Sequence, residues 1–140
     1  MGLILDTSAI IAWERAMSEG RKLDLGDDEE IALPAIVWAE ALIGVRLADS
    51  ASRAAQRRAR LEAIRRVVEV QSFTPEIAEH YADIFAELNA VGTMIPQNDL
   101  SVAATARAMN FGVLVGPRDE AHFRRVPGLV VRVLKTSPAE

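Results

Sequence analysis

Cysteine is absent from the 140-residue sequence, and histidine occurs only twice. The first absence excludes disulfides and zinc sites built on thiolates, and it leaves no indication of the redox compartment. The second argues against a metal site with several histidine ligands. A metal ion bound by this chain would therefore need carboxylate ligands, which favours Mg²⁺ or Mn²⁺.

Aromatic residues are also scarce, at 5% of the chain. The sequence therefore lacks the stacking platforms with which RNA-recognition sheets bind bases. The formal net charge of −4 argues against a protein that coats nucleic acid. It is compatible with a pocket of acids whose arginines lie elsewhere on the surface.

Long apolar runs are missing too. The first residues, MGLILD, include no basic segment, and Asp6 ends the apolar run. We therefore expect neither a signal peptide nor a membrane span, no membrane partner, and a cytoplasmic location.

Short apolar segments alternate with helical patterns along the chain. Strands are expected at residues 3–5, 31–33, 67–73, 113–115 and 130–134. The clearest helical pattern between them is the apolar stripe of Ile77, Tyr81, Ile84 and Leu88. Fully apolar strands that alternate with helices are typical of a parallel sheet covered on both faces. The sequence therefore predicts one α/β domain at residues 1–135 and a short polar tail at 136–140.

Three helix starts carry local signals. Pro34 is expected at the first helical position of a helix over residues 34–48. Thr74 is expected to cap the helix that begins at Pro75. Asn98 is expected to cap a later helix, which would leave the neighbouring Asp99 free to point across the edge of the sheet.

Four acids fall near the edge at which the predicted strands end. Asp6 follows the first strand, Glu40 lies in the helix after the second, and Asp119 follows the fourth. Asp99 opens the helix that precedes the fourth strand. In an open α/β sheet the functional crevice lies beyond the carboxyl ends of the strands. Four carboxylates gathered there would repel one another without cations, and two Mg²⁺ ions could clamp the attacking and leaving oxygens of a phosphodiester.

Each acid also has a purely structural interpretation. Asp6 could cap the helix that follows it, and Glu40 could face solvent. Asp99 could complement the dipole of its helix, and Asp119 could be a residue of a surface turn. Their common edge, rather than any single residue, favours the catalytic interpretation.

Four segments together resemble the PIN-domain family, and within it the VapC-type toxins of bacterial toxin–antitoxin pairs. These segments are LILDTSAIIA (3–12), PAIVWAEALIGV (34–45), PQNDLSVAATARAMN (96–110) and GVLVGPRDEAHFRRVPGL (112–129). The resemblance implies a three-layer α/β/α PIN-like domain with a mainly parallel central sheet. It also implies Mg²⁺-dependent endoribonuclease activity, for which Mn²⁺ can substitute. The implied partners are an RNA substrate, a cognate VapB-type antitoxin and a second copy of the chain in a homodimer.

Carried over by position, Asp6, Glu40 and Asp99 match the first three acids of the family, as catalytic residues and metal ligands. Asp119 is the expected fourth acid, and Glu120 is its alternative. The alternative stays open because the sequence after the fourth predicted strand departs from the family pattern. The expected reaction is hydrolysis of an RNA phosphodiester by a metal-activated water molecule.

Further residues are expected to contact the substrate. Thr7 and Ser8 follow the first acid, as hydroxyl residues do in this family, although both could simply cap a helix. Arg118 and His122 lie beside the expected fourth acid. Positive charge near the acids is needed to bind RNA, and the candidates by position are Arg15, Arg21, Lys22, Arg118, Arg124 and Arg125. A second basic cluster is interpreted as solvated helix edges: Arg53, Arg57, Arg58, Arg60, Arg65 and Arg66.

Several alternatives stay open. Trp13, Trp38, Ile36 and Val37 could line a groove for an antitoxin helix or could belong to the core. A haloacid-dehalogenase-like phosphatase would need a second Asp where Ser8 stands, and a receiver domain would need an Asp at the end of the third strand. A degenerate, non-catalytic PIN-like module that binds RNA or protein remains the main competitor.

Overall fold

The computed structural model describes residues 1–23, 25 and 29–134. Its strands are β1 (Leu3–Leu5), β2 (Ile31–Pro34), β3 (Glu69–Gln71), β4 (Gly112–Val115) and β5 (Val131–Val133). Its helices are α1 (Thr7–Ser18), α2 (Ala35–Arg46), α3 (Ala51–Arg65), α4 (Pro75–Val91), α5 (Gln97–Met109) and α6 (Glu120–Arg124). The predicted tail at 136–140 lies outside the described residues.

The strands form one parallel sheet in the order β3-β2-β1-β4-β5. The central strand β1 pairs with β2 on one side, where Leu3 lies opposite Ile31, and with β4 on the other, where Leu3 lies opposite Gly112. The central strands are apolar because both faces are covered by helices. The predicted α/β class with a parallel sheet is confirmed.

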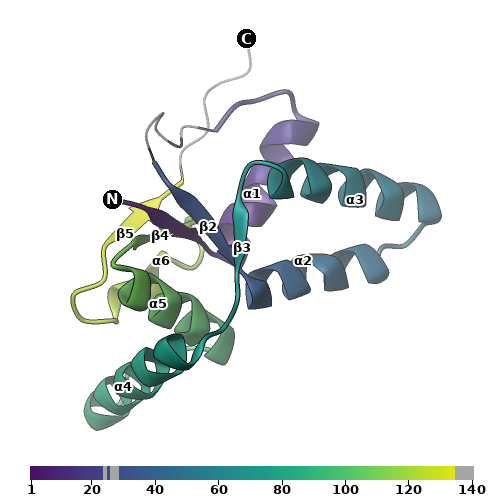
Figure 1. The fold of residues 1–140 in the computed structure, drawn as a ribbon. Coiled ribbons are helices and arrows are strands. Elements are labelled where there is room, and N and C mark those ends of the chain that lie inside the picture. Colours follow the sequence, from purple (N-terminus) through teal and green to yellow (C-terminus); the bar gives the residue numbers. More distant parts are fainter. Residues whose placement is uncertain (24, 26–28, 135–140) are drawn as a thin grey trace.

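Helices cover the sheet from two sides (Figure 1). α4 and α5 lie on one side, α1 and α3 lie on the other, and α2 extends from the carboxyl end of β2. Small side chains let α5 approach the sheet closely, since Ala103, Ala104 and Ala106 are fully buried. Within the described part of the chain, we find no helix whose length and apolar character would let it span a membrane.

Two helix starts differ from the prediction. Pro34 is the last residue of β2, opposite Gln71, and α2 begins one residue later. Its fixed φ of −60° suits extended backbone as well as a first helical turn. Asn98 is not a cap, because α5 begins at Gln97 behind Pro96 and Asn98 lies exposed inside the first turn. The Thr74 cap is confirmed, since its side chain accepts a hydrogen bond from the Ile77 N–H.

Two elements differ in length from the sequence pattern. The third strand covers only Glu69–Gln71, and Val67 and Phe73 at the ends of the predicted run are 71% and 54% exposed. The short helix α6 follows β4 and carries the fully buried Phe123. Burial of this ring fixes α6 against the sheet and thereby positions the residues around it.

Candidate active site

The carboxyl ends of β1 and β4 lie next to each other at the point where the strand order reverses. The chain leaves β1 at Asp6 and leaves β4 at Gly116. Parallel sheets of this kind open a crevice at such a point, because the connections from the two strands run in opposite directions. The crevice is therefore where the topology brings separate segments of the chain together.

Asp6 lies between β1 and α1 at this end of the sheet and is only 1% exposed. Its Oδ2 accepts hydrogen bonds from the Ser8 N–H at 3.2 Å and from the Ser8 Oγ at 2.5 Å. Asp6 therefore does cap α1, as its structural interpretation proposed. The cap holds the carboxylate in place, so it is compatible with a role in the site.

Ser8 connects the residue that follows β1 with the residue that follows β4. Its Oγ donates to Asp6 and accepts a hydrogen bond from the Gly116 N–H at 2.9 Å. A Cβ on Gly116 would lie 3.1 Å from the Ser8 carbonyl oxygen and 3.2 Å from its Cβ, so the close approach favours glycine. The turn after β4 is thus fastened directly to the start of α1.

Two more acids are held by side chains from other elements. The Thr7 Oγ1 donates to the Glu40 Oε1 at 2.7 Å, which fixes the half-buried Glu40 of α2. The Asp99 Oδ2 lies 2.7 Å from the His122 Nδ1, and the Asp99 side chain is 14% exposed. Asp99 thus points toward α6, although Asn98 does not supply the predicted cap.

The electrostatics show that the acids act on one another. Burial raises the pKa of Asp6 to about 6; Ser8 opposes the rise, and the nearby charges of Asp99 and Asp119 add to it. Burial also raises the pKa of Asp99, against the hydrogen bond from His122, while Asp119 and Glu40 raise it further. A raised pKa is what is expected for carboxylates that lie close together at a site shielded from solvent.

Two hollows, each of about 500 Å³, open over this site. Both are lined by Glu40, Asp99 and Asp119, so these carboxylates lie between them. The remaining lining of the first hollow comes from Thr7, Ser8, Ile11, Ala12, Arg15, Gly116, Pro117 and Arg118. The remaining lining of the second comes from Pro96, Gln97, Asn98 and His122. The structure therefore brings the predicted site residues together, with Asp6 buried beside them.

Some residues predicted by position lie elsewhere. Glu120, the alternative fourth acid, does not line either hollow and pairs with Arg124 at 2.6 Å. Of the six basic candidates, only Arg15 and Arg118 line the site. Sequence reasoning missed Ile11 and Ala12, although their spacing of four residues from Thr7 and Ser8 places them on the same face of α1.

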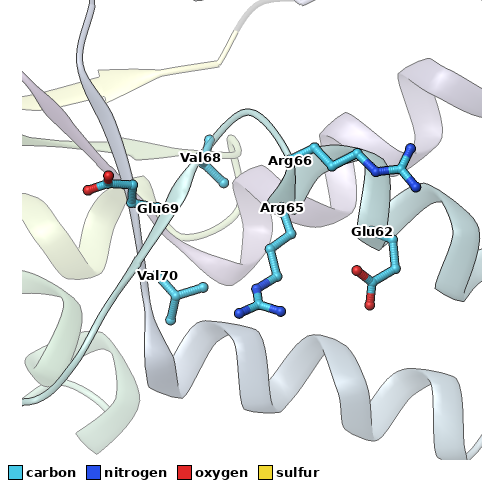
Figure 2. A pocket seen from close by; sticks show the side chains of 6 residues that line it. All are labelled: Glu62, Arg65, Arg66, Val68, Glu69 and Val70. Carbon is cyan, nitrogen blue, oxygen red and sulfur yellow. The ribbon is translucent and has the colours of Figure 1, made fainter.

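A separate hollow of about 440 Å³ lies between the end of α3 and the edge strand β3 (Figure 2). Arg65 there points toward α2 and lies 5.4 Å from the centre of the Trp38 ring, while Glu69 points away from it. None of the predicted site residues lines this hollow. Its lining consists of two acids, two arginines and two valines: Glu62, Arg65, Arg66, Val68, Glu69 and Val70.

Part of the basic cluster of α3 forms ion pairs, and so it is more than a set of solvated edges. Arg57 and Arg60 reach the buried Glu14 of α1, and Arg58 pairs with Glu62.

Trp38 is half-buried beneath Arg58 and Arg65 and packs against the core. Trp13 and Val37 also belong to the core or pack on it, while Ile36 is 36% exposed.

The acids fit a hard divalent cation by their chemistry. They offer carboxylate oxygens, and the pKa values of Asp6 and Asp99 are raised by burial and, to a smaller extent, by the charges of neighbouring acids. As the side chains stand, no three acidic or histidine groups within residues 1–23, 25 and 29–134 are grouped closely enough to hold an ion. Metal binding thus stays a prediction, and it requires these carboxylates to turn toward a common centre.

Comparisons with known proteins agree on the family. The PIN domain family matches residues 3–129. Ribonuclease VapC of Rickettsia bellii (strain RML369-C) is 33% identical over 131 residues, which cover 94% of this chain and 95% of that protein. Ribonuclease VapC1 of Rickettsia felis is 30% identical over 131 residues, which again cover 94% of this chain and 95% of that protein.

Solved structures show the same architecture. VapBC2 from Rickettsia felis, bound to a DNA fragment from its promoter, has a TM-score of 0.79 at 23% identity, over 96% of this chain and all of that one. VapBC-5 from Mycobacterium tuberculosis, a member of the VapBC family of toxin–antitoxin systems, has a TM-score of 0.73 at 28% identity. That match covers 94% of this chain and 96% of the other.

Proposed function

The chain belongs to the PIN-domain family, and from that premise we propose that it is a VapC-type toxin that cleaves RNA with Mg²⁺. The observation that carries the proposal is the convergence of four carboxylates at the crevice between β1 and β4. Asp6 is buried there, and Glu40, Asp99 and Asp119 line both hollows. Such a cluster is unfavourable without cations, and divalent cations are what phosphodiester hydrolysis uses.

Asp6, Glu40, Asp99 and Asp119 would hold the Mg²⁺, with Mn²⁺ as a substitute. The ion supplies Lewis acidity at the phosphate and a lowered pKa for water. The chain supplies orientation: Ser8 holds Asp6, Thr7 holds Glu40, and these hydrogen bonds reduce the movement needed for binding. His122 does the same for Asp99 through its Nδ1.

The partners follow from the family. Solved neighbours are described as VapBC toxin–antitoxin systems, which supports a VapB-type antitoxin as the partner of this chain. RNA as the substrate and a homodimer are further parts of the proposal. The non-catalytic alternative rested on the uncertain fourth acid, and Asp119 now lines the same hollows as Glu40 and Asp99.

The direct test is cleavage of single-stranded RNA by the purified chain with Mg²⁺, with Mn²⁺ and with EDTA. Asp99→Asn and Asp119→Asn should each lower kcat by at least about 100-fold, because a metal ligand is lost. Glu120→Gln is the matched control, since it removes an adjacent carboxylate that pairs with Arg124. Metal-independent cleavage, or full activity of Asp99→Asn, would contradict the proposal.

A further inference from the structure

Two arginines that line the site beside the carboxylates form no ion pair with a described acid. Arg15 lies in the last turn of α1, and Arg118 lies between β4 and α6. Both are exposed, and both line the first hollow. Among the residues that the structure describes, no carboxylate forms an ion pair with either guanidinium.

Several other arginines pair with an acid within the fold. Arg57 lies 3.2 Å from the Glu14 Oε1, and Arg107 lies 2.9 Å from the Glu87 Oε2. A guanidinium without a carboxylate partner is free to bind phosphate through two parallel hydrogen bonds. The first hollow therefore presents two guanidinium groups that form no ion pair, beside three acids.

The second hollow, on the other side of the same carboxylates, has a different chemistry. Apart from the acids, it is lined by Pro96, the amide side chains of Gln97 and Asn98, and the imidazole of His122. The described residues that line it include no lysine or arginine. Amides both donate and accept hydrogen bonds, so they suit the edge of a base better than a phosphate.

We propose that the two hollows bind the two flanks of one RNA strand as it crosses the carboxylates. Arg15 and Arg118 bind phosphate on one side of the scissile bond, and Gln97 and Asn98 contact a base on the other. Hollows of about 500 Å³ have the size of sites for small ligands, so each accommodates an unpaired nucleotide and not a duplex. The inference rests on the proposed nuclease function and adds how the substrate is held.

The arginine flank is tested with Arg15→Gln/Arg118→Gln on a single-stranded RNA of mixed sequence. KM should rise by about tenfold or more while kcat stays within about threefold, because the arginines bind substrate without touching the reacting atoms. The slope of log affinity against log salt should become shallower by about 1.4, the value for two lost phosphate contacts on a single strand.

A matched control is Arg65→Gln/Arg66→Gln, which removes the same charge from the hollow of Figure 2. This control should change KM by less than about twofold, since its hollow shares no lining residue with the site and salt screens charges exposed to solvent. Equal effects of the two double variants would overturn the proposal, because they would show a response to net charge alone.

The amide flank is tested with Gln97→Ala/Asn98→Ala by mapping cleavage sites in an RNA library of random sequence. The preferred nucleotide next to the cut should change, while the salt slope stays as in the wild type. An unchanged preference would overturn the assignment of this flank. Thermal melting of every variant confirms that the exposed substitutions leave the fold intact.

A failure of the proposed function can be told apart from a failure of this inference. If the wild type cleaves no RNA with Mg²⁺ or Mn²⁺, the nuclease proposal is wrong. RNA affinity measured in EDTA then still tests the arginine flank, since phosphate binding by Arg15 and Arg118 requires no metal. Identical affinities of the wild type and Arg15→Gln/Arg118→Gln would then overturn the inference as well.

Discussion

Asp6 and Glu14 are both buried acids, at 1% and 6% exposed, and they have opposite surroundings. Glu14 of α1 receives Arg57 at 3.2 Å and Arg60 at 4.0 Å, both from α3. Among the described residues, the Asp6 carboxylate receives hydrogen bonds only from the hydroxyl and the backbone N–H of Ser8, and the charges that act on it are other acids. One acid is surrounded by cations of the fold, and the other by negative charge.

The difference separates a structural acid from a functional one. A buried charge that is paired with cations loses much when a partner is removed, so Glu14 fastens α1 to α3. A buried charge among like charges costs stability, and such sites are found where the charge serves a function. The comparison can be tested by exchanging each carboxylate for its amide, which preserves the shape of the side chain.

The largest expected effect is on catalysis. Asp6→Asn should lower kcat/KM for RNA by at least about 100-fold, because a carboxylate of the cluster is lost. Glu14→Gln should leave kcat/KM within about threefold under conditions where it is folded, since Glu14 does not line either hollow. Steady-state cleavage of one RNA by both variants measures the contrast, and similar losses would refute the separation.

The next effect is the dependence of stability on pH. The pKa of Asp6 rises from its usual 3.8 to about 6 in the fold, so between these values the folded state binds more protons than the unfolded state. The stabilising contribution is therefore complete below about pH 4 and is lost as the pH rises through 6. The free energy of unfolding in EDTA should fall by up to about 3 kcal/mol across this window.

Urea denaturation at several pH values measures this loss. Asp6→Asn should flatten the profile, although the raised pKa of Asp99 leaves a part that acts in the same direction. Saturating Mg²⁺ should restore stability at pH 7 in the wild type and less so in Asp6→Asn, because the ion binds the ionised carboxylates. A wild type that gains stability between pH 4 and pH 7 in EDTA would contradict the account.

A smaller effect is expected from Glu14→Gln on stability. The amide leaves Arg57 and Arg60 without a counter-charge, and both side chains are about 30% exposed, so solvent reduces the cost. We expect a loss of about 2 kcal/mol in the free energy of unfolding, below the range for fully buried pairs. Glu62→Gln, which breaks the surface pair with Arg58, is the control and should cost less than about 1 kcal/mol. Equal losses would show that burial of Glu14 is unimportant.

The parts of the fold that could be predicted from the sequence are those with a local cause. The strand at Leu3–Leu5 is confirmed, because burial on both faces of the sheet leaves an apolar run in the sequence. The prediction that Asn98 caps α5 was wrong. A cap lies where the backbone enters the helix, and here that position is Pro96, two residues before Asn98. The helix α6 has only five residues, and it depends on the burial of Phe123 more than on local propensity.

The same distinction holds for the site. The convergence of the acids followed from a topological rule that needs only the positions of the strand ends. The contacts that hold the site acids were not predictable, because they join distant residues: Thr7 and Glu40 are 33 positions apart, and Ser8 and Gly116 are 108 apart. No local pattern distinguishes Glu14 from an exposed glutamate, so only the fold shows that it is paired.

The smallest effect concerns Gly44 of α2, and its sign depends on Glu14. A Cβ at Gly44 would overlap the guanidinium of Arg57, so Gly44→Ala must displace Arg57 from its position beside Glu14. In the wild type the lost contact should exceed the gain of about 1 kcal/mol that alanine brings to a helix, for a net loss of about 1 kcal/mol. In a Glu14→Gln background the contact is already weakened, so Gly44→Ala should be neutral or stabilising. Urea denaturation of the four proteins forms a double-mutant cycle. If Gly44→Ala lowers the free energy of unfolding equally in both backgrounds, the pairing of Arg57 with Glu14 contributes nothing to stability, and Gly44 only makes room for the Arg57 side chain.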